Sequence, residues 1–451
     1  MERPNATLAA VFRLLPVSVS GDDLKGANEQ VRRGVPANFA AIALNGLCFP
    51  TAGRILGAGL LLTWFISDLT TSAFWVGLVV PIQYGLALVA QPFVAEWLTG
   101  KPRRARYYTA QSLVRAVLWC TLGCAAWLLR KEYPALLLAI FFLVVITDAT
   151  AAGVGNIAFN DTLARVIPQR LRGRVRSWRG IFGSIAAGIA GLLIRYYFSE
   201  RSGVAAFGLL FAVAGALYAI GGLIFMLISE PEAARARSAK PKLSDLLRRM
   251  RGMMRHDAFR LFVFVESLLV PLSQALPFFT LFARRTFNLE IEALGLLVLI
   301  DALTPLVGNF VWGRLADARS NRWVIIAAAL TGLLAPVLCL LHYARSGSSL
   351  SPPSVLGVFA VVVFAIGFAS VGIDLATKNY ILDLAPNDSE RPVYIGVNDT
   401  LVGLPTMLLA GVGFIIDAFG FAPVFIGVGV IAIAGALFAT RLPSFTQGHT
   451  Q

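Results

Sequence analysis

Stretches of about twenty mostly apolar residues recur from the thirties of the chain to its end. A membrane-spanning helix needs about 20 such residues, because each residue adds about 1.5 Å and the hydrocarbon core is about 30 Å thick. The pattern therefore predicts twelve membrane-spanning helices. We expect them near residues 37–64, 73–95, 106–129, 134–157, 177–197, 205–228, 259–281, 292–314, 324–343, 354–376, 393–416 and 422–441.

The composition supports an all-α integral membrane protein. Hydrophobic residues make up 57% of the chain and charged residues 14%, which is too little charge to cover a soluble protein of 451 residues. The four cysteines lie within predicted spans, and neither they nor the three histidines show the spacing of a metal site. We therefore expect no metal and no cofactor.

The net charge of +14 is explained by where the basic residues lie. Most of the 39 Lys and Arg residues fall in the N-terminal tail and in the loops that follow predicted helices 2, 4, 6, 8 and 10. Because short cytoplasmic loops are enriched in Lys and Arg, this pattern predicts that both termini are cytoplasmic, in a bacterial inner (plasma) membrane. The basicity then indicates contact with anionic membrane lipids and no nucleic-acid partner.

The two halves of the chain repeat each other at an offset of about 220 residues. Phe39 corresponds to Phe259, and Glu96 corresponds to Asp317. The exit from helix 4, at residues 164–168, corresponds to the exit from helix 10. The expected divisions are a tail at 1–36, a six-helix bundle at 37–228, a linker at 229–257, a second bundle at 258–441 and a tail at 442–451.

The stretch from Gly308 to Trp323 reads GNFVWGRLADARSNRW and predicts a tight loop between two spans. It resembles the signature Gly-x-Leu-Ala-Asp-Arg-x-Gly-Arg-Arg of the major facilitator superfamily, although three positions after Asp317 differ from it. The resemblance implies two pseudo-symmetric six-helix bundles, with a solute site between them and alternating access by rocking. The matching residues are Gly313, Leu315, Ala316, Asp317 and Arg322.

The same resemblance implies a gate of charged residues at the cytoplasmic side. In the family, such residues form ion pairs between the bundles and hold the inner gate shut in the outward-open state. The alternative is solvated charge that only sets the membrane topology. The expected gate residues are Asp317, Arg319, Arg322, Glu96, Arg172 and Arg174.

Charged residues deep inside predicted spans are the candidates for a solute or proton site. A charge at the bilayer centre costs about 2.5–3.5 kcal/mol on insertion scales, so such a residue normally faces a cavity or a partner. A buried pair that only fixes helix packing is the alternative reading for each acid. The candidates are Glu266, Asp301, Asp148, Arg54 and Arg115.

Glu266 is the favoured proton carrier. It precedes Pro271, which can break helix 7 and open its backbone towards a cavity. A carboxyl group removed from water favours its neutral form, whereas one beside Arg favours its charged form. Pairing therefore decides which acid can carry a proton.

These patterns favour a secondary active transporter that moves a small solute with a proton as the coupling ion. No Ser, His and Asp set and no phosphate-binding glycine loop occurs, so we expect neither an enzyme nor an ATP-driven pump. The sequence leaves the solute and the oligomeric state open. The alternatives are an uncoupled facilitator, a lipid translocator, and a non-transporting membrane receptor or assembly factor with the same fold.

Overall fold

The computed structural model describes the chain with short gaps. The described residues are 6–15, 19–20, 22–24, 29–86, 94, 97–98, 103–129, 132–199, 201, 203–231, 248, 250–287, 289, 291–344, 352–386 and 390–444. Within them every regular element is a helix, and eleven helices are long and apolar enough to cross a membrane. At the position expected for the second span, the described residues form a shorter apolar helix, Ala73–Leu86. An all-α, multi-pass membrane protein is confirmed.

Contacts divide the chain into two compact units. The first comprises Met1–Leu56, Ala90–Ala190 and Gly203–Lys240, and the second comprises the remainder. The second unit therefore includes Gly57–Val89 and Gly191–Ser202, which the sequence repeat assigns to the first bundle. The repeat boundaries stay a prediction.

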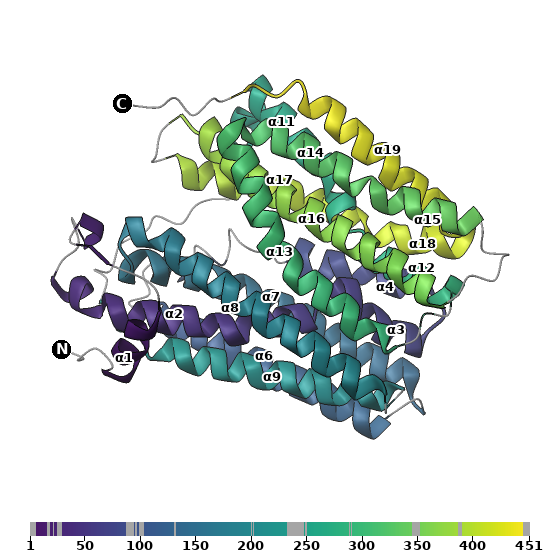
Figure 1. Ribbon diagram of the computed structural model, residues 1–451, viewed down its shortest axis with the longest axis horizontal. Coiled ribbons are helices and arrows are strands. Elements are labelled where there is room, and N and C mark those ends of the chain that lie inside the picture. Colours follow the sequence, from purple (N-terminus) through teal and green to yellow (C-terminus); the bar gives the residue numbers. More distant parts are fainter. Residues whose placement is uncertain are drawn as a thin grey trace. The chain divides into compact units, whose positions relative to one another are not determined.

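In the first unit, long helices pack side by side through small residues. α6 lies beside α7 and α9, and α2 lies beside α9 (Figure 1). A Cβ atom at Gly123 of α6 would lie 2.6 Å from the carbonyl oxygen of Gly208 of α9, so these two backbones touch. The elements are α1 (Ala6–Leu14), η1 (Asp22–Leu24), α2 (Glu29–Ile55), α6 (Ala105–Leu129), α7 (Pro134–Val166), the first part of α8 (Gln169–Ser199) and α9 (Val204–Met226).

The N-terminal segment is folded against the first unit. α1 packs on α2, where the rings of Phe12 and Phe39 meet edge to face at 5.3 Å. The Ser20 N–H donates to Asp23, and the Asp23 N–H donates to the Ser20 hydroxyl. The hydrogen bond from the Ser20 N–H lowers the pKa of Asp23, and an ion pair with Arg174 at 3.2 Å contributes to the lowering.

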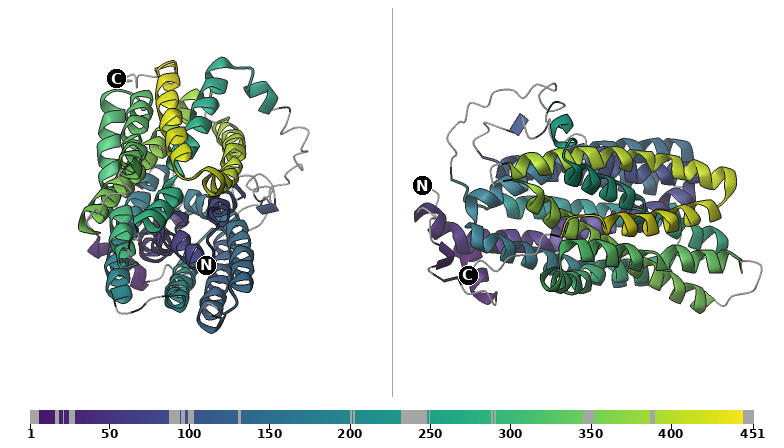
Figure 2. Two further views of the ribbon diagram at one scale, coloured as in Figure 1. Left: turned by 90° about the vertical axis from the view of Figure 1, so that its right-hand side faces the viewer. Right: turned by 90° about the horizontal axis from the view of Figure 1, so that it is seen from above.

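The second unit contains the second half of the chain and the segments that join it. α19, drawn in yellow, runs beside α14 and α15, drawn in green, while α16 lies beside α13 and α14 (Figure 2). The elements are η2 (Ala58–Leu62), α3 (Thr63–Leu69), α4 (Ala73–Val80), η3 (Pro81–Leu86), α11 (Asp257–Ser273), α12 (Leu276–Phe287), α13 (Ala293–Ala318), α14 (Asn321–Gly332), α15 (Leu334–Ala344), α16 (Pro352–Leu384), α17 (Arg391–Leu408), α18 (Ala410–Phe419) and α19 (Ala422–Ala439).

The loop expected within Gly308–Trp323 is shorter than the sequence suggested. α13 continues through Ala318, and α14 begins at Asn321, so Arg319 and Ser320 form the whole link. The residues at 314–318 include no Gly or Pro, and most of them tolerate a helix well. Asp317 consequently lies in the last turn of α13.

The helix that carries Glu266 is interrupted just after Pro271. α11 ends at Ser273, and α12 begins at Leu276. The carbonyl oxygen of Ser273 accepts a hydrogen bond from the Ser370 hydroxyl of α16 at 3.0 Å. The backbone group released by the break is thereby satisfied inside the protein, as a non-aqueous surrounding requires.

Candidate functional site

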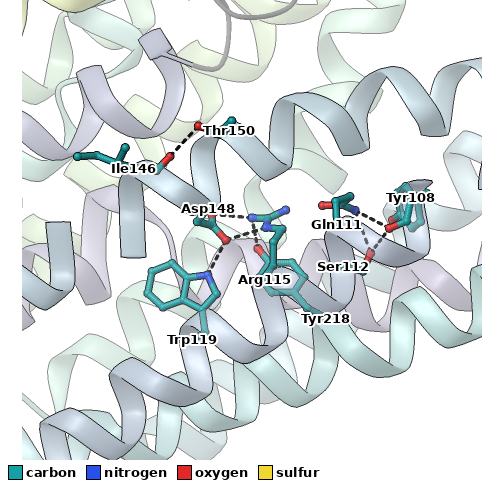
Figure 3. Close-up of polar contacts among 9 residues, drawn as sticks. All are labelled: Tyr108, Gln111, Ser112, Arg115, Trp119, Ile146, Asp148, Thr150 and Tyr218. Atoms are coloured by element: carbon teal, nitrogen blue, oxygen red, sulfur yellow. Dashed lines mark hydrogen bonds and ion pairs between the residues drawn. The ribbon is translucent and has the colours of Figure 1, made fainter. Parts of the chain in front are cut away.

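Two of the deep charges predicted from the sequence form one buried ion pair in the first unit. The Arg115 Nε of α6 lies 2.7 Å from Asp148 Oδ1 of α7, and the Arg115 Nη2 lies 2.9 Å from Oδ2 (Figure 3). The exposed fractions are 7% for Arg115 and 2% for Asp148. Two parallel N–H···O bonds of this kind fix both orientation and distance.

Aromatic side chains complete the network around this pair. The Trp119 Nε1 donates to Asp148 Oδ1 at 2.7 Å, and Arg115 Nη2 donates to the Tyr218 hydroxyl of α9 at 2.7 Å (Figure 3). The Arg115 guanidinium also lies 5.2 Å from the centre of the Phe49 ring. These partners join α6, α7, α9 and α2, so the network holds four helices of the first unit together.

The other two deep candidates apart from Glu266 are carried by other helices. Arg54 is in the last turn of α2. Asp301 is on α13, where its Oδ1 lies 3.7 Å from the Cβ position of Gly367 on α16. The structure thus brings Arg115 and Asp148 together, while Arg54 belongs to the first unit and Asp301 to the second.

Glu266 has a different kind of environment in the second unit. The Asn398 Nδ2 of α17 donates to Glu266 Oε2 at 2.8 Å, and the Thr377 hydroxyl of α16 is a further hydrogen-bonding neighbour. The exposed fractions are 5% for Asn398 and 4% for Thr377. An amide and a hydroxyl can both donate and accept, so these partners suit either protonation state of a carboxyl group.

The charged side chains next to Glu266 are carboxylates. Asp399 and Asp374 are its charged neighbours. Lys378, a basic neighbour of Asp399, pairs with Asp374 at 2.6 Å on the exposed side of α16. In the described part of the chain, Glu266 forms no ion pair.

A third polar group occurs where α3, α4, α12 and α18 meet in the second unit. Asp417 of α18 accepts hydrogen bonds from the Ser72 hydroxyl at 2.6 Å, the Ala73 N–H at 2.7 Å and the Phe74 N–H at 3.1 Å. The first N–H groups of a helix have no partner within the helix. Asp417 therefore caps α4 from a helix that lies more than 300 residues away in the sequence.

Two consecutive arginines of α12 bind α3, the turn between α3 and α4, and Asp417. Arg284 pairs with Asp68 and donates to the Trp64 carbonyl oxygen at 2.6 Å. Arg285 donates to the Thr71 carbonyl oxygen and lies 3.8 Å from Asp417. We call Asp68, Ser72, Arg284, Arg285 and Asp417 the Arg284 cluster.

The expected gate residues of the second unit lie where α13 ends and α14 begins. Asp317 and Arg319 are exposed at the end of α13. Arg322 donates to the Leu442 carbonyl oxygen at 3.0 Å, just beyond α19. The gating role of these three residues stays a prediction.

The expected gate residues of the first unit have local partners. Arg172 donates to the carbonyl oxygens of Ile167, at 3.0 Å, and Ala164, at 2.6 Å, which closes the end of α7. Arg174 pairs with Asp23 of the N-terminal segment. Glu96 lies outside the described residues. Arg172 and Arg174 likewise remain predicted gate residues.

Sequence reasoning missed the Arg284 cluster and the partners of Glu266. One signal was the Arg284–Arg285 pair, which stands at a predicted outer helix end where basic residues are scarce. A second was Asn398, which precedes Asp399 in a polar interruption of predicted helix 11.

Removal of either partner of the buried pair should destabilise the first unit. Asp148→Asn or Arg115→Gln leaves the other charge buried and unpaired, which typically costs about 3–5 kcal/mol. We expect each single variant to lower the apparent Tm of the detergent-purified protein by several degrees. The double variant Arg115→Met/Asp148→Leu should recover most of the loss. Equal Tm values for the wild type and the single variants would show that the pair does not hold the unit together.

Comparisons with known proteins agree with this architecture. A model of the Major Facilitator Superfamily matches residues 263–449. An uncharacterized protein of Mycobacterium bovis is 23% identical over 307 residues, which are 65% of this chain and 56% of that protein. The chain thus spans little more than half the length of that relative. An uncharacterized MFS-type transporter of Bacillus subtilis, YfnC, is 29% identical over 175 residues, 37% of each chain.

Solved transporter structures share the fold along the chain. A mutant of the nucleoside transporter NupG superposes with a TM-score of 0.68 at 14% identity, over 90% of this chain and 99% of that one. A D-xylose-proton symporter superposes with a TM-score of 0.65 at 14% identity, over 92% and 99%. A POT family transporter in complex with 5-aminolevulinic acid gives 0.68 at 13%, over 90% and 96%. Together, the family match and the shared fold confirm the resemblance of this chain to the transporters of the major facilitator superfamily, with no particular subfamily indicated.

Proposed function

We propose that this chain is a secondary active transporter that moves a small solute across the membrane by alternating access. The observation that carries the proposal is the fold, which nine-tenths of the chain shares with transporters of nucleosides, of D-xylose with protons, and of the POT family. Membrane-embedded polar groups add support, because charged residues in spans are expensive and typically mark a pathway.

The Arg284 cluster is the proposed outer gate. It consists of hydrogen bonds and ion pairs, for which water can substitute when the helix ends separate. Closure of the cluster joins the ends of α3 and α4 to α12 and α18. In the proposed cycle the cluster is closed while the solute site opens to the cytoplasm, and it is broken in the outward-open state.

The proposed orientation follows from the basic loops. Arg172 and Arg174 lie at the start of α8, and the loop residues between α13 and α14 include Arg319. We place these ends and both termini in the cytoplasm, because Lys and Arg concentrate on that side of a membrane. The exposed Asp317 and Arg319 are then available for ion pairs of the inner gate in the outward-open state.

Glu266 is the proposed proton carrier. Its amide and hydroxyl neighbours accommodate both the carboxyl and the carboxylate form. Asp148 differs, because Arg115 and Trp119 offer it only donors, so a proton there would displace an existing bond. Protonation of Glu266 next to Asp399 changes the charge balance of the second unit, which can be linked to opening and closing.

Glu266→Gln should remove proton coupling. The solute is first sought by a thermal-shift screen at two pH values, since a bound ligand raises the apparent Tm by mass action. In proteoliposomes, an inward proton gradient should drive accumulation of that solute by the wild type. We expect Glu266→Gln to lose the response to the gradient while downhill exchange persists, because glutamine cannot release a proton. Asp257→Asn, an exposed acid on the same helix, is the control. An unchanged pH dependence in Glu266→Gln would show that Glu266 is not the proton carrier, and a wild type that ignores the gradient would leave an uncoupled facilitator as the function.

Asp417→Asn should weaken the outer gate. Thr280 is 2% exposed and donates to the Gly59 carbonyl oxygen next to the cluster, so Thr280→Cys reports opening. The reporter is placed in a chain whose four native cysteines are replaced by alanine. Loss of hydrogen bonds to a charged group should raise labelling by a membrane-impermeant maleimide about tenfold.

The matched control for this gate variant is Glu292→Gln. Glu292 is an exposed acid at the start of α13, and its replacement should leave labelling unchanged. If Asp417→Asn labels at the wild-type rate, the cluster does not hold the outer ends closed.

A further inference from the structure

The arginines of α8 differ in what they contact. Arg172 and Arg174 bind carbonyl oxygens and Asp23, as described above. Arg176 donates to the Asn160 Oδ1 of α7 at 2.9 Å, and Arg179 donates to the Asn45 Oδ1 of α2 at 3.1 Å. Both of these partners are neutral amides. Among the described residues, neither Arg176 nor Arg179 has a carboxylate partner.

The surroundings of Arg176 add positive charge. Arg172 and Arg179 are its charged neighbours. Asp161, the residue after Asn160 on α7, is already paired with Arg104 at 3.1 Å and lies 3.8 Å from Arg165. Three guanidinium groups thus share one region, and an anion is the complement that their chemistry favours.

Space for a ligand is present beside Arg176. Among the described residues, no atom lies within 4 Å of a Cβ atom placed at Gly173 or Gly180, and the Arg176 side chain between them is exposed. Gly191 lies on the same face, since it follows Gly180 by about three turns. There a Cβ atom would lie 2.7 Å from the Leu299 N of α13. Within the described residues, this face of α8 contacts α13 at Gly191, in the second unit, and is open around Arg176, in the first unit.

Arg179 is held in a fixed position at the edge of this region. Its guanidinium lies 4.4 Å from the centre of the Phe159 ring and is half-buried. Stacking on an aromatic ring leaves the outer N–H groups of a guanidinium available for a second partner. Arg179 is thus oriented before any ligand binds, which reduces the entropy lost on binding.

We propose that Arg176 and Arg179, with the Asn160 amide, bind a phosphate or carboxylate group, and that the transported solute is an organic anion. The inference rests on the proposed transport function and adds the solute class to it. The bound group belongs to a soluble molecule, and the same chemistry in a lipid headgroup is distinguished by the test below. Arginine binds such groups through two N–H donors, which supplies both strength and orientation.

The test measures the apparent Tm of the purified protein in sodium phosphate and in sodium citrate, at constant ionic strength set with sodium chloride. Both anions should stabilise the wild type. Arg176→Gln and Arg179→Gln should each lower the apparent affinity about tenfold or more, because each removes charge-assisted hydrogen bonds. Arg179→Lys keeps the positive charge and serves as a second variant if Arg179→Gln folds poorly. It should bind both anions more tightly than Arg179→Gln does.

The control is Arg260→Gln, which removes one positive charge from an exposed arginine of α11. It should bind both anions as the wild type does. Equal stabilisation of all variants, or none of the wild type, would overturn the site. Stabilisation by phosphatidylglycerol vesicles alone, lost in Arg176→Gln, would assign the site to a lipid headgroup and overturn the solute class. Neither result would affect maleimide labelling at Thr280→Cys, so this inference can fail while alternating access stands.

Discussion

Polar groups inside a hydrocarbon layer must find their partners within the protein, and this requirement explains the main features of the chain. The backbone satisfies it by forming helices throughout the described spans. The break after Pro271 satisfies it through the contact between Ser273 and Ser370. Arg115 and Asp148 satisfy it by pairing with each other and with two aromatic side chains. These three exceptions to a simple apolar helix therefore each have a specific neighbour.

The Arg115–Asp148 network, Glu266 and the Arg284 cluster each provide partners for buried polar groups. They do so in ways that suit different roles. The Arg115–Asp148 network is closed, since both charges are buried and matched. Glu266 has neutral partners and acidic neighbours, so its protonation changes the local charge. In the Arg284 cluster the partners come from helix ends, where water can replace them. We therefore propose that the Arg115–Asp148 network is a fixed support, that Glu266 is the coupling group and that the Arg284 cluster is a gate.

The sequence predicted the fold well because helices in a membrane have a strong local signal. Composition and apolar runs indicated the spans, and the cost of buried charge pointed to Arg115 and Asp148 before any contact was known. The roles of Tyr218 and Trp119 depend on how the helices pack, so the order of apolar and polar residues along the sequence does not indicate them. The Arg284 cluster joins residues more than 200 positions apart, and its capped helix end involves backbone groups. The loop within Gly308–Trp323 was overestimated because a helix can continue past its apolar segment.

The most direct test of the account is a reversible cross-link at the proposed outer gate. A Cβ atom at Gly59 would lie 3.0 Å from the Leu276 Cβ of α12, so a small outward shift of the two backbones reaches the separation of about 3.8 Å in a disulfide. The variant Gly59→Cys/Leu276→Cys, without the native cysteines, is assayed for transport before and after reduction. Alternating access predicts that the oxidised protein is inactive and that reduction restores transport. Full transport by the cross-linked protein would contradict the opening of this gate.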